Sequence, residues 1–427
     1  MQQLASQNAP SPGVVVPHFI FGAVVWLCVT ILIISFPGAF VQHYFNPRLL
    51  SITHLLALGW ITMIIFGALY QLVPVILEIK LFSEKLSVTS FVSLAIGCIL
   101  ISVSFWKFQF SGMMHAGATF AVIAVSLFAV NIFATARNSA KKTIERKFIL
   151  TSVVWLVFTV SAGMTLAINL SSPFLEVSHL ELLKLHAHAG IVGWFMQLII
   201  GVSSKLIPMF IVSHHLNENK LRISYYLINI GLLSFIISLF LEYTPGVLFG
   251  VILVVAGISF FLSFVYEAYK KRVKRNLDLG MKQSMIAFLM LLIPVLLSLV
   301  FVSELWDTGK LTIPLAVAYG STIFIGFITS LIMGQTYKTL PFIIWLKVYR
   351  GKVGKGKLPF PKDLYSEKLA DFQLWTFIPG FATLIVGIIL LNKIIVTISG
   401  ILLLISVSIY FFNLMKIILH KPITLHE

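Results

Sequence analysis

The stretch HAHAGIVGW, residues 186–194, is followed by Gly201 and Pro208, and the same frame occurs twice more in this chain of 427 residues. His54–Trp60 reads HLLALGW and aligns with HAGIVGW 134 positions later, whereas Gly320–Phe327 reads GSTIFIGF and aligns a further 133 positions on. The shared glycines and proline of the three copies are Gly59, Gly67 and Pro74; Gly193, Gly201 and Pro208; and Gly326, Gly334 and Pro341. Three copies at one spacing predict a threefold internal repeat.

The composition is that of a membrane protein. Apolar residues make up 59% of the chain and charged residues 11%, and the mean hydropathy is +0.99. A membrane-spanning helix needs about 20 largely apolar residues, and twelve segments qualify, centred near residues 27, 62, 96, 124, 158, 196, 231, 256, 292, 328, 381 and 404. We therefore expect an all-α polytopic membrane protein whose twelve transmembrane helices form three pseudo-symmetric four-helix repeats. The repeats would cover residues 17–136, 147–268 and 283–418, within a single transmembrane domain over residues 1–427.

The chain carries a net charge of +16, and its charges are distributed as topology signals. Of the 31 Lys and Arg residues, 24 fall in the loops after even-numbered spans or at the C-terminus, among them a basic loop at about residues 347–372. This asymmetry follows the positive-inside rule and predicts a multi-pass protein of the inner (plasma) membrane with both termini in the cytoplasm. These loops are expected to contact anionic lipids of the bilayer, and no nucleic-acid partner is expected.

Four histidines lie near the outer ends of predicted spans. With the N-terminus inside, the second, fourth and sixth spans begin at the outer face, and each has a histidine within about its first two turns. These residues are His54, His115, His186 and His188. An ionisable side chain within the bilayer is costly, so such residues tend to face the bundle interior and carry function. Neutral imidazole is also a common ligand of iron, copper and zinc.

Helical spacing separates the two histidines of the sixth span. Residues two apart on an α-helix point about 200° away from each other, so His186 and His188 would serve two sites on opposite sides of one helix. His54 and His188 are equivalent in two repeats and share one depth, as bis-histidine ligation of a haem requires. His186 with His115 would form a second iron or copper site. The alternative is structural: an outer-end histidine can hydrogen-bond a neighbouring carbonyl, and nearby glycines can pack helices.

The run HAHAGIVGW, continued by Gly201 and by Leu206–Pro208, resembles the tenth-helix signature of haem–copper oxidase catalytic subunits. The resemblance is strongest to the C-family cytochrome c oxidases and the related nitric oxide reductases, where an H-x-H pair precedes a Gly-aromatic stretch. It implies twelve helices in three arcs, with His188 as a ligand of a low-spin haem and His186 as the ligand of a second, high-spin haem. The expected cofactor is a b-type haem, with a second haem or copper as a further candidate.

The chain also departs from this family. The H-x-H pair is on the sixth span, and the tenth carries Ser321 at the corresponding position. The family's adjacent pair of copper-binding histidines on the seventh helix is missing, because Ser224–Leu241 contains no histidine. All 15 Asp and Glu residues fall in loops or at span ends, so no carboxylate proton path through the bundle is predicted. We therefore expect a divergent relative without the full copper site and without proton pumping.

Polar residues follow the repeated glycines at the inner end of the motif. The fourth residue after the second glycine of each copy is Gln71, Lys205 or Lys338, and Tyr337 precedes the last of these. The lysines are expected to extend toward the inner interface, and the tyrosine is expected to belong to an interfacial aromatic belt. The other interpretation is a mouth for protons or anions on that side.

Two classes of function follow. The first is a haem protein that transfers electrons, or that binds or reduces nitric oxide or oxygen near the outer face. Such an oxidoreductase would take electrons from quinol, from cytochrome c or from a partner subunit. The second is a transporter of a metal, haem or small solute that uses the same histidines. Transporters with twelve spans commonly consist of two halves of six, so three repeats of four favour the first class.

Overall fold

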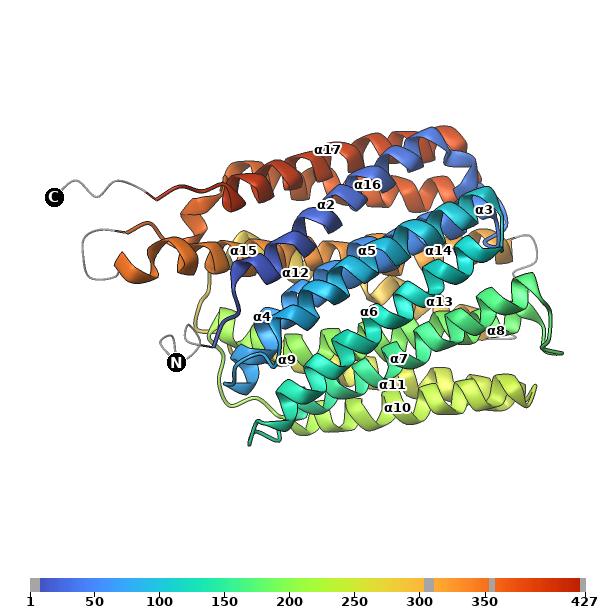
Figure 1. Cartoon of the computed structure of the whole chain (residues 1–427), viewed down its shortest axis with the longest axis horizontal. Helices are drawn as coiled ribbons and strands as arrows, with labels where there is room; N and C mark the ends of the chain where they lie inside the picture. Colours follow the sequence, from blue (N-terminus) through green and yellow to red (C-terminus); the bar gives the residue numbers. More distant parts are fainter. Residues whose placement is uncertain (1–7, 303–310, 353–357, 423–427) are drawn as a thin grey trace.

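Twelve long helices run through the computed structural model, which describes residues 8–302, 311–352 and 358–422 (Figure 1). Within those ranges every regular element is helical, and twelve helices are long and apolar enough to cross a membrane, as the sequence predicted. The elements of the first repeat are α2 (Pro12–Ser35), η1 (Pro37–Val41), α3 (Pro47–His54), η2 (Leu55–Thr62), α4 (Met63–Leu77), α5 (Glu84–Lys107) and α6 (Gly112–Arg137). Those of the second are α7 (Ile144–Ser171), α8 (His179–His188), η3 (Ala189–Met196), α9 (Gln197–Ile211), α10 (Asn219–Phe240) and α11 (Thr244–Lys270). Those of the third are α12 (Leu279–Met290), α13 (Leu292–Val302), α14 (Thr312–Ser321), η5 (Thr322–Ile328), α15 (Thr329–Tyr349), η6 (Arg350–Lys352), η7 (Pro361–Leu364), α16 (Glu367–Ile389) and α17 (Lys393–Ile418).

The helices pack in the same order in all three repeats. The third and fourth spans of each repeat form a helical hairpin, α5 with α6, α10 with α11 and α16 with α17. The first span of a repeat packs on the last span of the preceding one, and α2 closes the ring on α17 (Figure 1). Between 67% and 89% of the apolar window is buried in the second, sixth and tenth spans, against 28% to 50% in the other nine described spans. The three spans that carry the repeated motif are therefore the central ones.

Each central span contains a stretch of π-helix at the same position of the repeat. These stretches, η2, η3 and η5, begin directly after His54, His188 and Ser321. A π-helical turn is wider than an α-helical one, and such turns are rare and frequently lie at functional sites. The sequence motif therefore corresponds to a change of helix geometry immediately below the histidine level.

The glycine of each π-helical stretch meets a side chain of a neighbouring helix. A Cβ atom at Gly59 would lie 2.8 Å from the sulfur of Cys98. At Gly193 and Gly326 it would lie 2.6 Å from the rings of Trp155 and Phe381. No side chain larger than hydrogen fits at these distances, so the repeated glycines allow close packing at the centre of the bundle.

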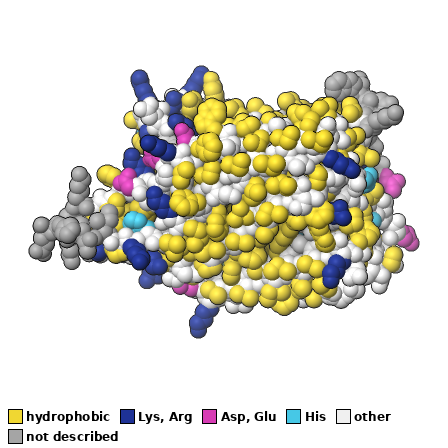
Figure 2. Space-filling view, turned by 90° about the horizontal axis from the view of Figure 1, so that it is seen from above, with side chains coloured by type: hydrophobic (Ala, Val, Ile, Leu, Met, Phe, Trp, Pro, Cys, Tyr) yellow, Lys and Arg dark blue, Asp and Glu magenta, His cyan; other side chains and the backbone are white. Residues whose placement is uncertain are grey.

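The two ends of the bundle differ in charge. Both termini lie at one end, here called the terminal end, and α3, α8 and α14 start at the opposite end, here called the histidine end (Figure 1). Lys and Arg side chains gather at the terminal end, and hydrophobic side chains cover most of the surface between the ends (Figure 2). The basic loops thus share a side with the termini, and the assignment of that side to the cytoplasm stays a prediction.

Two local features differ from the sequence expectation. The ninth span is divided at Leu291, because Pro294 has no N–H to donate to the carbonyl of Met290. The basic loop expected at residues 347–372 is shorter, because α15 runs to Tyr349 and α16 begins at Glu367. Residues 353–357 of that loop lie outside the described ranges.

The contact between α12 and α15 gives a test of the packing. A Cβ atom at Gly334 would lie 2.8 Å from the carbonyl oxygen of Gly280, whereas nothing lies within 4 Å of one at Gly320 in the same span. Gly334→Ala should therefore lower the free energy of unfolding by about 1–3 kcal/mol. Gly320→Ala should be neutral or raise it slightly, because glycine is a poor helix former. Unfolding of both variants in mixed detergent micelles measures this, and equal effects would contradict the packing argument.

Candidate functional site

Two histidines from different spans, His54 and His186, line one cavity toward the histidine end. Its volume is about 200 Å³, and we call it the paired-histidine cavity. The second, third and fourth spans and α7 form most of its wall with aliphatic and aromatic side chains, and α8 and η3 complete it. Its lining includes Phe45, Leu50, Ala57, Ile101, Phe105, Met114, Leu156, Thr159, Gly163, His179, Gly190, Trp194 and Phe324. His179, at the start of α8, is a third imidazole in the wall, and the rest of the lining is largely apolar.

Backbone carbonyls hold both histidine rings. Nδ1 of His54 lies 2.8 Å from the carbonyl oxygen of Leu50, and Nδ1 of His186 lies 3.0 Å from that of Thr159. A carbonyl only accepts, so each Nδ1 carries the proton and each Nε2 keeps its lone pair. Within the described ranges neither Nε2 makes a hydrogen bond. A fixed tautomer with a free Nε2 is the state in which histidine binds metals.

Neighbouring residues shape the space around these rings. A Cβ atom at Gly163 would lie 2.9 Å from Cε1 of His186, so this position on α7 makes room for the imidazole. The ring of His54 stacks on Phe105, with 4.6 Å between ring centres and 24° between planes. Both rings are therefore fixed in orientation by packing as well as by hydrogen bonds.

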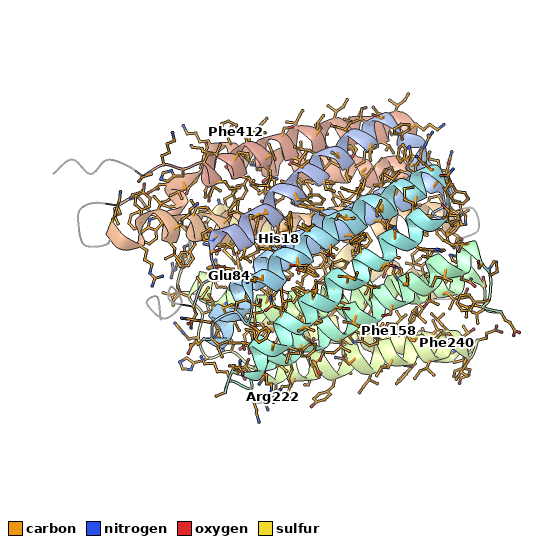
Figure 3. The ribbon with its side chains drawn as sticks, in the orientation of Figure 1. His18, Glu84, Phe158, Arg222, Phe240 and Phe412 are labelled. Carbon is orange, nitrogen blue, oxygen red and sulfur yellow. The ribbon has the colours of Figure 1, made fainter. Side chains whose placement is uncertain are left out.

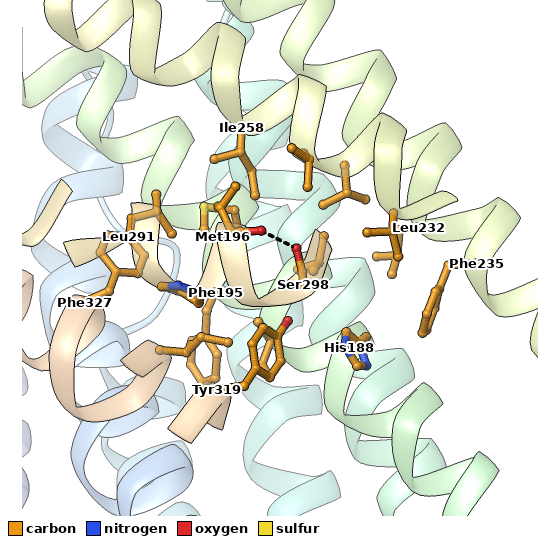
Figure 4. Close-up of a pocket in the computed structure, with 18 of the residues that line it drawn as sticks. His188, Phe195, Met196, Leu232, Phe235, Ile258, Leu291, Ser298, Tyr319 and Phe327 are labelled. Atoms are coloured by element: carbon orange, nitrogen blue, oxygen red, sulfur yellow. Dashed lines mark hydrogen bonds between the residues drawn. The ribbon is translucent and has the colours of Figure 1, made fainter. Parts of the chain in front are cut away.

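His188 lines a second cavity, shown in Figure 4 and called the single-histidine cavity. Its volume is about 80 Å³. Nδ1 of His188 lies 2.8 Å from the carbonyl oxygen of Lys184, so this ring too has its Nε2 free for another partner. The rings of Phe235 and Tyr319 lie 4.8 Å and 6.1 Å from it. Ser298 also lines this cavity, with its hydroxyl bonded to a backbone carbonyl.

The structure brings His54 together with His186 and places His188 elsewhere. The repeat had suggested His54 and His188 as the pair, because they occupy equivalent positions. His186 and His188 lie two residues apart on α8, so one faces the paired-histidine cavity and the other faces the single-histidine cavity. Ile191 and Phe195 belong to the walls of both cavities, which are therefore neighbours.

His115 lies outside both cavities. Its Nε2 is 2.9 Å from the hydroxyl of Ser171. Its helix α6 packs on α5 and α7, whereas α8 packs on α7, so the structure does not bring His115 to His186. Over residues 8–302, 311–352 and 358–422, no three His, Cys, Asp or Glu side chains come together as a metal-binding group. Any cofactor bound here must therefore need only one or two protein ligands.

The lysines of the motif lie at the terminal end in different surroundings. Lys205 is exposed, whereas the side chain of Lys338 is 18% exposed and its Nζ lies 2.6 Å from a carboxylate oxygen of Asp278. Asp278 also accepts a hydrogen bond from Lys274, at 2.8 Å. Burial alone would raise the pKa of Asp278, but the hydrogen bonds from the two lysines lower it below its ordinary value. Lys338 is thus held in an ion pair and does not extend freely to the interface.

Gln71 and Tyr337 are both buried. Gln71 is 5% exposed and Tyr337 is 3% exposed. The ring of Tyr337 stacks on Tyr365, with 4.9 Å between ring centres. The expectation of an interfacial aromatic belt is therefore wrong for Tyr337, because its ring is enclosed by the third repeat.

His18 is a buried residue that the sequence did not single out. It is 0% exposed and lies on α2 inside the bundle (Figure 3). Its ring lies 5.7 Å from Tyr70 and 4.9 Å from Phe91. Gly67 of the motif is the sequence feature that could have indicated this burial. A Cβ atom at Gly67 would lie 2.6 Å from Cβ of His18, so the glycine allows α2 to pack closely and bury the imidazole.

Comparisons with known proteins agree with this architecture. No sequence profile of a known protein family matches the chain. An uncharacterised protein of Aquifex aeolicus (strain VF5) is 26% identical over 294 residues, which is 68% of this chain and 70% of that protein. A chain of a haem–copper terminal oxidase dimer, determined by cryo-EM, superposes with a TM-score of 0.69 at 12% identity and covers 96% of this chain and 85% of that chain. The protein therefore has the fold of a haem–copper terminal oxidase.

The ion pair at the terminal end predicts a dependence of stability on pH. Because the pKa of Asp278 is lowered on folding, its stabilisation is present above the ordinary pKa of 3.8 and is lost as the pH falls through the folded value. At pH 7, Asp278→Asn should lower the free energy of unfolding by about 1 kcal/mol. The asparagine keeps the cap on the backbone N–H of Met281, so the difference reports the charge. Unfolding curves of both proteins from pH 7 to pH 3 should converge, and a constant gap would exclude the ion pair as its source.

Proposed function

We propose that this chain is a haem-binding membrane protein in which His54 and His186 hold one haem between the second and sixth spans. One observation carries the proposal: two imidazoles from different helices line one apolar cavity, each with Nδ1 bonded to a carbonyl and Nε2 free. The fold shared with a haem–copper terminal oxidase supports it. The proposed function is electron transfer, or the binding or reduction of nitric oxide or oxygen.

The residues present fit such a group. A haem carries its iron within its own ring system, so few protein side chains would be needed to hold it. Two imidazoles are sufficient for this, and no third ligand needs to approach. When bound, a b-type haem supplies a one-electron iron centre whose potential depends on its axial ligands and on burial. The carbonyls of Leu50 and Thr159 fix the ring orientations and increase the basicity of each Nε2.

The single-histidine cavity is the proposed second site. His188 would hold a second haem or copper there, and that group would supply a site for binding a diatomic gas. Tyr319 lines the same cavity and its hydroxyl could donate a hydrogen bond there. Ile191 and Phe195 line both cavities, so the two proposed sites would be neighbours.

The rest of the proposal concerns surroundings and partners. We place the protein in the inner membrane with the terminal end in the cytoplasm, and we expect quinol, cytochrome c or a partner subunit as the electron donor. Proton pumping is not part of the proposal. Among the residues that the structure describes, no Asp or Glu is buried.

A reduced-minus-oxidised visible spectrum of the purified protein tests the paired-histidine site. The wild type should show sharp low-spin bands, because two imidazoles give a strong axial field. His54→Ala and His186→Ala should each lower these bands at least tenfold, whereas His188→Ala should leave most of their intensity. His115→Ala is the matched control, because this histidine lies outside both cavities.

The pattern of losses separates the alternatives. Loss of the low-spin bands in His54→Ala and His188→Ala, but not in His186→Ala, would restore the pairing suggested by the repeat. A wild-type protein that is monodisperse but free of haem in both redox states would reject the haem proposal. Metal or solute transport through the same histidines would then be the function to examine.

A further inference from the structure

A third cavity lies between the three central spans. Its volume is about 100 Å³, and its wall comes from α4, α9, η5 and α15, with Phe19 of α2. Repeat-equivalent residues recur in this wall at intervals of 134 and 133 positions. Two such sets are Ile64, Leu198 and Leu331, and Ala68, Val202 and Gln335. The cavity therefore lies on the pseudo-threefold axis of the repeats, and we call it the axial cavity.

The third repeat gives the axial cavity one polar wall. Gln335, Thr336 and Thr339 of α15 line it, at positions where the first repeat has only aliphatic side chains. The hydroxyls of Thr336 and Thr339 donate to backbone carbonyls of their own helix, at 2.8 Å and 2.9 Å. The amide nitrogen of Gln335 donates to the hydroxyl of Ser284 at 2.8 Å and to the sulfur of Met281 at 3.9 Å.

The donors of this wall are thus occupied, and its remaining capacity is to accept hydrogen bonds. The amide oxygen of Gln335 has no hydrogen-bond partner within the described ranges. A threonine hydroxyl that donates still has a lone pair for a second bond, and that of Thr336 already accepts from Tyr410 at 3.1 Å. Gln335 and Thr339 therefore offer acceptors to a ligand that carries a donor.

Size and charge limit the ligand further. Protein interiors contain few voids larger than a water molecule, and an apolar cavity of about 150 Å³ stays dry and binds benzene or xenon. The walls from α4 and α9 are aliphatic apart from Ser203. Among the described residues, none that lines the axial cavity is charged, so a charged ligand would lose its hydration without compensation. The ligand is therefore small, uncharged and largely apolar.

We propose that the axial cavity binds a small neutral molecule with an apolar body of single-ring size and one hydroxyl, which donates to the acceptors of Gln335 and Thr339. This site lies outside both histidine cavities and does not depend on haem in either of them. Ile328 lines the axial cavity and also the single-histidine cavity, so the two are neighbours.

Xenon tests whether the space is dry and accessible. Crystals of the wild-type protein held under xenon should show an anomalous-scattering peak between α4, α9 and α15. Ala68→Ile should remove this peak by filling the cavity, since the equivalent positions already hold the longer Val202 and Gln335. Ala116→Ile, on the exposed face of α6, is the matched control and should keep it. A wild-type cavity that takes up no xenon would overturn the proposal.

Phenol, benzene and benzoate test the chemistry, because they share one ring and differ in hydrogen bonding and charge. Phenol should raise the Tm of the wild type by about 2 °C more than that of Ala68→Ile, because a ligand of the folded state stabilises it. Comparing the two proteins removes the effect of phenol dissolved in the detergent micelles. Benzene should give a smaller difference and benzoate none. Equal shifts by phenol in the two proteins, or a larger difference with benzoate, would overturn the proposal.

The double variant Gln335→Leu with Thr339→Val tests the polar wall. It gives α15 an aliphatic wall like that of α4 and leaves the cavity open, so xenon should still bind. Its affinity for phenol should fall about fivefold, the effect of one hydrogen bond, and approach that for benzene. An unchanged preference for phenol would overturn the assignment of these acceptors. The haem spectrum of every variant should match the wild type, so a failure here is distinct from a failure of the haem proposal.

Discussion

In the interior of this bundle, each polar atom must find its partner within the protein, because neither lipid nor apolar side chains can hydrogen-bond. That requirement explains the helices, and it also explains how the functional groups are held. The three outer histidines of the cavities each satisfy Nδ1 with a backbone carbonyl, which leaves only Nε2 for another ligand. Where the requirement is not met by protein, each unpaired atom would cost about 1–3 kcal/mol.

The threefold repeat gives three similar central helices, and function arises where the copies differ. Each central span changes to π-helix immediately after the same position, occupied by His54, His188 or Ser321. His186 has no counterpart in the other copies, where Ile52 and Tyr319 stand. This additional histidine lets the sixth span face two cavities at once, one of them shared with the second span. The third copy has no histidine at the motif position, and its polar residues lie deeper, between α12, α15 and α16.

The sequence predicted the architecture because that depends on periodic signals along the chain. Apolar segments of sufficient length gave all twelve spans, and equal spacing of glycines and prolines identified the central three. The partner of His54 could not be predicted in the same way. Helical spacing fixes the angle between His186 and His188. It does not fix which of the two faces the second span, because that depends on how α8 packs on α7. The burial of His18 and the π-helical turns likewise depend on contacts with neighbouring helices, which no local pattern records.

The paired-histidine cavity and the contact between α12 and α15 both depend on glycines, but in different ways. Gly163 removes a side chain so that the ring of His186 can turn its Nδ1 toward a carbonyl, and the resulting cavity is wide and apolar. Gly280 and Gly334 bring α12 and α15 into backbone contact, and the polar groups beside them are confined to a narrow line. A wide apolar cavity suits a flat, largely apolar group, whereas the close contact of α12 with α15 leaves room only for backbone packing. Of these three glycines only Gly334 belongs to the repeated motif, so glycines outside the motif, and the side chains beside them, also shape the interior.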